Sequence, residues 1–595
     1  TTANCLSSLV LMEKTSSKDL LQKLIKFRSQ AIESIIKDDS PHSVRHRIRF
    51  CVKLLTDTIS LIHSCFIKSC SNSNGLVAHN IKSIADQEAS TMLFQLDLNN
   101  QLMEKYLPSV TKNHRPFAKG EFKDISSSDL TEKLETWFEW VKKFTSSEIK
   151  RLLTLVTSVR GVFNIREESL GVELPENWSE MWKDLSMSPV NFWTSFFQPL
   201  LTDRVKEIIK MRWEEAFEDL KSNIQDFLSH LSNEKFSYPE HDLRWFIWKD
   251  SPTDIPQKLS KTTTTDTKRS LLMKAKGYSP NLVDLIVKFD GNLQLLLSDL
   301  EQYLYESENV PSVVENLLTM TIGSIFDKFE DRNGIQEDLQ RISAHMIDRI
   351  VDFVKCECIG SDVNVIVMAR FLQAITALCP NLNKCFTLSK VAGLTITNVK
   401  WQSVCEKVKN ESLTVWLTWV NNYSVKLKEH LNKFLISEPI DGLRINRIIS
   451  EWERVVIEEE GEEGKRIKSE ILVPYQPSAD LQKFLAAVIR DLNKIVPHTV
   501  PRKVLQEFSD RIIRELFEYY EGVVKIENLR QKQAFQVLLD IKYVTLLLVP
   551  RENQEYLDRS QEICNGVLGR IDPFDSDVFY PFIHANVKKS VQRTL

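Results

Sequence analysis

The sequence predicts an all-α protein, an elongated rod built from successive antiparallel helical bundles. Glycine is scarce, 16 of 595 residues, against roughly 7% in average proteins. Sheet-rich folds need glycine at tight turns and bulges, so its scarcity favours helices. Apolar residues recur every third or fourth position in one stretch after another, which is the spacing of amphipathic helices. No internal repeat of roughly 30 to 45 residues is found, which argues against a regular helical solenoid.

The composition excludes several classes of protein. Hydrophobic residues make up 42% and charged residues 27% of the chain, as in globular proteins that bury a core. Lys plus Arg is 77 and Asp plus Glu is 81, so we expect no nucleic-acid partner, because such proteins usually carry a strong basic excess. No apolar run approaches the roughly 20 residues that span a bilayer. We therefore expect no transmembrane span, and any membrane association to be peripheral.

Ten cysteines are scattered without the paired spacing of a zinc site. We expect them to be buried, reduced thiols in a cytosolic protein.

Residues 1–257 are predicted to form amino-terminal helical bundles. A first amphipathic helix ends at Asp38 to Pro41, and Asp129 with Glu132 resembles a capping box in which Asp129 is the N-cap. Six aromatic residues then gather within twenty positions. Core packing between short helices explains them better than a ligand surface does. The apolar residues of the first helix are Leu20, Leu24, Phe27, Ala31 and Ile35, and the aromatic residues are Trp178, Trp182, Phe192, Trp193, Phe196 and Phe197.

Residues 258–268 are predicted to be a flexible polar linker, because four consecutive β-branched threonines disfavour a helix there. Residues 269–457 follow as middle helical bundles. A helix is expected to begin at Ser279 and Pro280 and to carry a heptad seam of about three repeats. An internal bundle contact is favoured for so short a seam, with a partner helix as the alternative. The seam consists of Leu282, Ile286, Phe289, Leu293, Leu296, Leu300 and Tyr303.

The carboxy-terminal part is predicted to begin with an acidic loop at 458–464, since like charges repel and two glycines break helices. Residues 465–595 are expected to form a carboxy-terminal helical bundle with an aromatic and acidic tail. Pro573 and Pro581 interrupt that tail, which predicts that it is not one continuous helix.

No motif for catalysis, for a cofactor or for a metal is found. The chain lacks a glycine-rich phosphate loop, a serine elbow and a His-Glu-x-x-His sequence. Asp572, Asp575 and Asp577 lack the glycine and terminal glutamate of a calcium loop. An all-helical enzyme is the remaining catalytic alternative, and it would need convergent polar groups in a pocket, such as a buried acid–His or Cys–His pair.

The tail gives the most specific signal. Ile571-Asp-Pro-Phe-Asp-Ser-Asp-Val-Phe579 and Val591-Gln-Arg-Thr594 resemble the carboxy-terminal segment of the subunit-one family of the conserved oligomeric Golgi complex. The similarity is spread over most of the chain in the same order and is strongest in the tail and near Trp452. The other similar stretches are Leu20-Leu-Gln-Lys-Leu24 with Phe27-Arg28, Val367-Met-Ala-Arg370 before Leu378-Cys-Pro380, Trp452-Glu-Arg-Val-Val456 and Gln476-Pro-Ser478.

This resemblance implies a non-catalytic scaffold subunit of a vesicle-tethering complex made of helical rods. It implies a place on the cytoplasmic face of Golgi membranes and in the cytosol, and a role in intra-Golgi retrograde transport that maintains glycosylation. Subunits two, three, four and eight of the complex are the implied partners, with vesicle-fusion machinery as a further one. We expect the family's full amino-terminal coiled-coil region to be missing from this chain. The alternative is a helical adaptor of another rod-type tethering complex.

The candidate partner-binding residues lie in the tail and near the acidic loop. An exposed interface and a plug that closes the last bundle are alternative interpretations of the aromatic tail. No catalytic, cofactor-binding or metal-binding residue is assigned. The candidates are Trp452, Phe574, Asp575, Asp577, Phe579, Tyr580 and Phe582.

Overall fold

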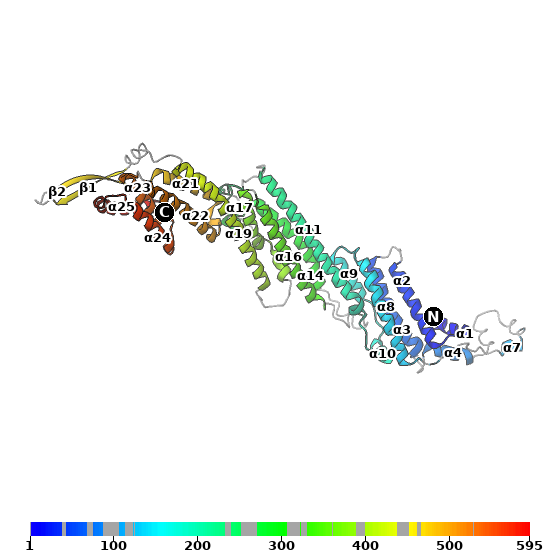
Figure 1. Ribbon diagram of the computed structural model, residues 1–595. Helices are drawn as coiled ribbons and strands as arrows, with labels where there is room; N and C mark the ends of the chain where they lie inside the picture. The colour runs from blue at the N-terminus through cyan, green and yellow to red at the C-terminus, as the bar shows by residue number, and fades with distance from the viewer. Residues whose placement is uncertain are drawn as a thin grey trace, which may run out of the picture. The chain divides into compact units, whose positions relative to one another are not determined.

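The computed structural model confirms the all-α class, because helices make up nearly all of the described elements and strands contribute a single two-stranded sheet (Figure 1). The described chain divides into two compact units, which are treated separately. Unit 1 comprises Thr1–Ala216, Asn292–His345 and Lys384–Gly393, and unit 2 comprises Phe217–Gly291, Met346–Asn383 and Leu394–Leu595. The structure describes residues 2–37, 43–67, 75–86, 106, 108–113, 123, 125–232, 240–250, 271–305, 322, 330–359, 361–387, 399–436, 452–460, 466–526 and 529–594.

Unit 1 is organised around α3, which packs against α2, α8 and α9. Four helices are divided between the two units: α11 (Gln198–Ser232), α14 (Pro280–Leu304), α16 (Arg332–Glu357) and α18 (Pro380–Thr387). The elements that belong to unit 1 alone are α1 (Thr2–Met12), α2 (Ser17–Lys37), α3 (Val44–Ile62), the π-helical turn η1 (His63–Ile67), α4 (Leu76–Asp86), α7 (Ser109–Lys112), α8 (Ser127–Leu153), α9 (Val159–Leu170), α10 (Trp178–Asp184) and the π-helical turn η2 (Trp193–Phe197).

The aromatic cluster predicted in unit 1 is core, as expected. All six residues are buried, and Trp178 meets Trp182 edge to face with ring centres 5.6 Å apart. Phe138 of α8 joins them, 5.6 Å from Phe192. Two details of the prediction are wrong. Phe27, assigned to an apolar face, is 59% exposed, and the N-cap of α8 is Ser126, whose Oγ accepts the Asp129 backbone N–H at 3.3 Å.

Unit 2 is built on a pair of long helices, α17 and α19, that run antiparallel. Lys426 of α19 lies 2.6 Å from Asp362 at the start of α17, whereas Ser412 bonds to the carbonyl of Ala369 further along. The helices α22, α23, α24 and α25 then pack on one another. The elements of unit 2 alone are α12 (Arg244–Ile247), α17 (Asp362–Leu378), α19 (Val399–Leu431), η4 (Asn432–Ile436), β1 (Glu453–Glu460), β2 (Arg466–Val473), α21 (Ala479–Ile495), η5 (Pro497–Thr499), α22 (Arg502–Val524), α23 (Gln531–Leu548), α24 (Gln554–Leu568) and α25 (Pro573–Thr594).

The predicted acidic loop is wrong for its first three residues. Glu458 to Glu460 belong to β1, which pairs with β2 as an antiparallel hairpin in which Glu453 faces Val473 and Glu460 faces Arg466. The opposite charge of Lys468, 3.0 Å from Glu458, relieves the repulsion that argued for a loop. Residues 461–464 lie outside the described residues, as does the predicted linker 258–268. The predicted limits of the amino-terminal, middle and carboxy-terminal parts stay a prediction.

The prediction that the tail is not one continuous helix is wrong. The helix α25 runs without a break from Pro573 to Thr594, with Pro581 inside it. Pro573 occupies the first turn, where no backbone N–H is needed. Pro581 leaves the carbonyl of Asp577 without its helical donor, at a cost of about 3 kcal/mol. Pro581 is exposed, so water can reach that carbonyl. Burial of three apolar residues further along the helix offsets the cost: Ile583, Val587 and Val591.

The heptad seam of α14 is confirmed as an internal contact, because all seven of its side chains are at most 5% exposed. By length and composition one described helical stretch, Val44–Ile67, passes the criteria for a membrane span, or two if the bent pair α17 and α18 is counted together. The sequence analysis did not single out Val44–Ile67, since polar residues interrupt this stretch. Its apolar window is 61% buried inside the protein, and a buried core helix satisfies the same criteria.

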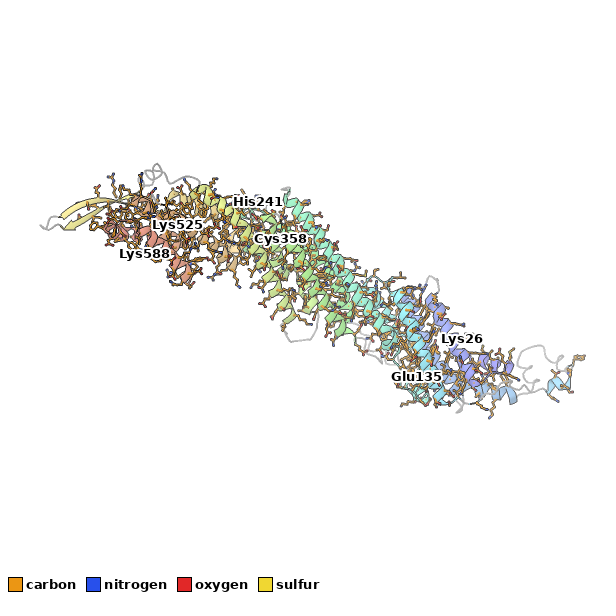
Figure 2. All side chains as sticks on the ribbon, in the orientation of Figure 1. Lys26, Glu135, His241, Cys358, Lys525 and Lys588 are labelled. Atoms are coloured by element: carbon orange, nitrogen blue, oxygen red, sulfur yellow. The ribbon has the colours of Figure 1, made fainter. Side chains whose placement is uncertain are left out.

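The cysteine prediction is confirmed in part. Nine cysteines lie in the described chain, none of these nine is in a disulfide, and six are buried. Burial raises the pKa of the Cys358 thiol, labelled in Figure 2 just beyond α16, to about 11. Cys5 and Cys356 are exposed, which is contrary to the expectation.

Candidate partner-binding surfaces in the carboxy-terminal helices

A groove of about 740 Å³ lies between β2 and the first turns of α23 and α25. It brings together elements that are far apart in the sequence. Its lining carries two basic and two acidic side chains beside three aromatic rings. This surface is called the hairpin groove, and its lining consists of Trp452, Glu470, Ile471, Leu472, Arg530, Gln531, Lys532, Phe535, Asp575 and Phe579.

Three of the seven candidate residues meet in the hairpin groove, namely Trp452, Asp575 and Phe579. Each is held by a neighbour. The Phe579 ring stacks on Phe535 with ring centres 4.5 Å apart, and the Gln531 amide donates a hydrogen bond to Asp575. Phe579 therefore packs against α23, and whether it acts as a plug or as an interface stays a prediction.

The other four candidates lie outside the hairpin groove. Phe574 is 75% exposed and Asp577 is also exposed, while Phe582 is half-buried. Tyr580 is 42% exposed, and the Lys542 ammonium lies 4.3 Å from its ring centre and donates to its hydroxyl at 2.8 Å. Some of the candidate residues are therefore packed against neighbours and others face solvent. Phe574 is the most exposed aromatic residue among them.

A buried polar network anchors the base of the hairpin. Trp452 Nε1 donates to Gln536 Oε1 at 3.1 Å. Gln536 Nε2 in turn donates to the carbonyl of Gln476 at 3.0 Å and to Asp540 Oδ1 at 3.1 Å. Asp540 also accepts the backbone N–H of Ser478 at 2.8 Å. The network therefore ties β1, α23 and the start of α21 together.

The segment between β2 and α21 is held from the other side by α25. Asn586 Nδ2 donates to the carbonyl of Pro474 at 3.1 Å, and Ser590 Oγ donates to the carbonyl of Tyr475 at 3.3 Å. Ser478 then caps α21, because its Oγ accepts the backbone N–H of Leu481. Buried backbone groups in this segment thus find partners, as they must away from water.

Sequence reasoning missed Gln536 and Asp540. Both are buried in α23, and they are spaced four residues apart, which places them on one helical face. The signal that could have found them is a pair of polar residues on an otherwise apolar stretch that includes Phe535, Leu538 and Leu539.

Asp540 gives this network a pH dependence. Burial raises the pKa of its carboxyl from 3.8 to about 6, against the lowering effect of the Ser478 and Gln536 hydrogen bonds. A raised pKa in the folded state means that folding favours the protonated form. The stabilisation is therefore complete below about pH 4 and is lost as the pH rises through about 6.

Replacing Asp540 by asparagine is expected to raise the free energy of unfolding at pH 7.5 by roughly 1–3 kcal/mol and to leave it nearly unchanged at pH 4. The amide oxygen still accepts from Ser478 but carries no buried charge. Thermal unfolding followed by circular dichroism at several pH values measures the difference. Asp577→Asn, at an exposed position of α25, is the control. An equal effect of Asp540→Asn at both pH values would contradict the assignment.

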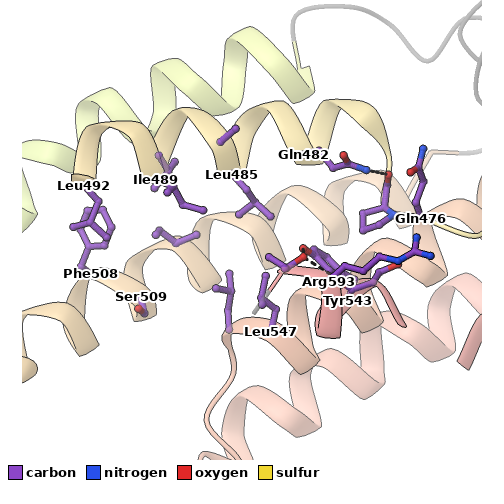
Figure 3. A pocket seen from close by; sticks show the side chains of 17 residues that line it. Gln476, Gln482, Leu485, Ile489, Leu492, Phe508, Ser509, Tyr543, Leu547 and Arg593 are labelled. Atoms are coloured by element: carbon purple, nitrogen blue, oxygen red, sulfur yellow. Dashed lines mark hydrogen bonds between the residues drawn. The ribbon is translucent and has the colours of Figure 1, made fainter. Parts of the chain in front are cut away.

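A second groove, called the helical groove, lies among α21, α22, α23 and α25 and has a volume of about 420 Å³ (Figure 3). Its lining is mostly apolar, with polar residues mainly near Gln476 and Arg593. The hydroxyls of Tyr543 and Thr594 share a hydrogen bond of 2.8 Å beside it. The lining consists of Gln476, Pro477, Gln482, Leu485, Ala486, Val488, Ile489, Leu492, Phe508, Ser509, Ile512, Tyr543, Leu547, Leu548, Ser590, Arg593 and Thr594.

An all-helical enzyme would need a buried acid–His or Cys–His pair in a pocket. Acid–His pairs occur at two places in the described chain. His63 Nε2 lies 2.9 Å from Asp184 Oδ2, and His430 Nε2 lies 3.0 Å from Asp491 Oδ2. The first joins η1 to α10 and the second joins α19 to α21, and neither pair lines the hairpin groove or the helical groove. Among the described residues no group of three His, Cys, Asp or Glu side chains is placed to hold a metal ion.

Comparison with known proteins gives one consistent result. The chain is 24% identical over 670 residues to the human conserved oligomeric Golgi complex subunit 1, covering 100% of this chain and 68% of that protein. The identity to the subunit 1 of Drosophila melanogaster is 24%, covering 64% of it, and to that of Mus musculus 24%, covering 68%. The chain thus spans about two thirds of the length of these relatives. No protein-family model matches the chain, and no solved structure matches it significantly.

Proposed function

Because the chain belongs to the family of conserved oligomeric Golgi complex subunit 1, we propose that it is a scaffold subunit of a Golgi vesicle-tethering complex. The observation that carries the proposal is similarity along 100% of this chain to three curated members of one family. The helical architecture and the grooves among the carboxy-terminal helices fit a protein that works by binding other proteins.

The proposed mechanism is binding without catalysis. A subunit that holds several partners at once converts modest single affinities into a stable assembly, because each further contact forms within the complex. The proposed partners are subunits two, three, four and eight of the complex and the vesicle-fusion machinery. The proposed place is the cytoplasmic face of Golgi membranes, with peripheral attachment. The proposed process is intra-Golgi retrograde transport, and through it the maintenance of glycosylation.

Affinity purification of the tagged chain from its own cells tests the proposal. The expected result is recovery of the other subunits of the Golgi complex in near-equal amounts, measured by quantitative mass spectrometry. Recovery of only the subunits of a plasma-membrane or lysosomal tether would show that the chain is an adaptor of another complex. Lectin staining of cells that lack the chain checks the process, and unchanged surface glycans would contradict a role in glycosylation.

Within this function we propose Phe574 as a partner contact. Phe574→Ala is expected to reduce recovery of at least one partner subunit about tenfold and to leave the midpoint of thermal unfolding within about 1 °C of the wild type. The physical reason is that a 75% exposed ring contributes little to the core but loses its water when a partner covers it. Quantitative pulldown and circular dichroism measure the two effects.

Phe579→Ala is the matched control on the same helix. Its ring stacks on Phe535, so we expect a loss of about 1–3 kcal/mol in the free energy of unfolding. A fall in the unfolding midpoint for Phe574→Ala as large as that for Phe579→Ala would identify both residues as the plug and reject the interface.

A further inference from the structure

The helical groove runs along one face of α21. Gln482, Leu485, Ile489 and Leu492 line it and follow one another at intervals of three or four residues, so they share that face. The span from Gln482 to Leu492 corresponds to about 15 Å of helix axis. A partner helix of three turns has the same length.

The groove leaves apolar surface open to water. Ile489 is 49% exposed at its edge, while Leu485 and Val488 form its buried floor at 8% and 2% exposure. On the other wall, Phe508 and Ile512 come from α22, and further leucines come from α23. Covering the apolar part of this concave surface is favourable by about 25 cal/mol per Å² of apolar area. A contiguous apolar concavity on a protein surface is typical of an interaction site.

The charge of the groove is asymmetric. Its seventeen lining residues include one charged side chain, that of Arg593. Arg593 is exposed and makes no ion pair with any other described residue. Arg593 lies at the end of the groove near Gln476, whereas Leu492 and Phe508 close the opposite end (Figure 3). A complementary ligand is therefore apolar along its length and negatively charged at one end.

We propose that the helical groove binds a short amphipathic helix of a partner protein, with an acidic side chain of that helix beside Arg593. Apolar side chains at positions i, i+4 and i+7 of such a helix fill the space along α21. The carbonyl end of the bound helix lies toward Arg593, because that end carries partial negative charge. The inference rests on the proposed scaffold function for the expectation that the partner is a helical protein.

A display library of three-turn helical peptides, randomised on one face and at the last turn, tests the proposal on the full chain. The expected outcome is enrichment of peptides with aliphatic residues at i, i+4 and i+7 and with Asp or Glu in the last turn. Ile489→Glu is expected to weaken the selected peptides at least about thirtyfold in fluorescence anisotropy. Val287→Glu is the matched control, because Val287 of α14 is 47% exposed and does not line the groove.

A charge reversal distinguishes specific binding from nonspecific hydrophobic binding. Arg593→Glu is expected to weaken acidic peptides about tenfold and to restore binding when the acid of the peptide is changed to lysine. Circular dichroism of each variant confirms that the chain is folded. The proposal is overturned if no peptide is enriched or if Ile489→Glu leaves the affinity of the selected peptides unchanged. It is also overturned if a labelled fatty acid or an extended peptide occupies the groove instead.

The two proposals fail in different ways. Loss of peptide selection with normal recovery of Golgi complex subunits rejects the helical groove alone. Normal peptide selection with recovery of a different tether rejects the Golgi function and keeps the groove.

Discussion

Replacing Arg370 by methionine is expected to lower the free energy of unfolding by about 3–5 kcal/mol, because it leaves a buried carbonyl without its donor and removes the charge that opposes buried Glu240. The midpoint of thermal unfolding should fall by roughly 10 °C. Arg370 is 2% exposed in α17, and its Nη2 donates to the carbonyl of Ile495 at 2.7 Å. Methionine fills a similar volume but leaves that carbonyl without this donor.

The opposite charge of Glu240, which acts on Arg370 electrostatically, adds to the effect. Glu240 is 5% exposed, and Asn281 Nδ2 donates to its Oε1 at 3.0 Å. Burial raises the pKa of Glu240 against the opposing charge of Arg370, and burial lowers the pKa of Arg370 to about 10 against the charge of Glu240. Desolvation therefore outweighs attraction for both groups, so removing one charge leaves the other buried and uncompensated.

A double variant checks this explanation. Glu240→Gln combined with Arg370→Met should recover more than half of the loss, because no isolated charge then stays buried. Arg490→Met, at an exposed position of α21, should change stability by less than about 0.5 kcal/mol. An Arg370→Met variant as stable as Arg490→Met would show that buried Arg370 does not stabilise unit 2.

Replacing Trp452 by alanine is expected to cost about 3–5 kcal/mol, as for other large aromatic residues removed from a core. Trp452 is 8% exposed, and its removal leaves Gln536 Oε1 without its indole donor. Trp452→Phe keeps most of the volume and should cost about 1–2 kcal/mol for the lost hydrogen bond. Circular dichroism with increasing urea measures both variants.

Hydrogen exchange shows where the effect of Trp452→Ala is located. A two-stranded hairpin is marginal by itself, so exchange at the β1 and β2 amides should rise more than at α17 amides. Unchanged exchange in the hairpin would contradict the anchoring role. Trp452 is buried, so any effect on a partner at the hairpin groove comes through the position of the hairpin.

The local sequence pattern predicted most helices correctly, because the backbone hydrogen bonds of a helix join residues only four positions apart. The starts at Pro280 and after Ser478 and the end at Leu378 agree with local capping and proline signals. The same local reasoning was wrong at Pro581 and at Glu458. In both places a contact from elsewhere decided the outcome, through packing of the following turns of α25 and through the cross-strand partner Lys468.

By itself the sequence determined the all-α class, the apolar stripes that become core and the absence of a recognisable catalytic motif, since these depend on residues close together in the chain. The tertiary structure alone decided which tail aromatics are packed and which face solvent. It also decided where the grooves form. The physical reason is separation along the chain: Trp452 meets Gln536 across 84 positions and Arg370 meets Ile495 across 125. No periodicity encodes such pairings, because they arise only when helices pack.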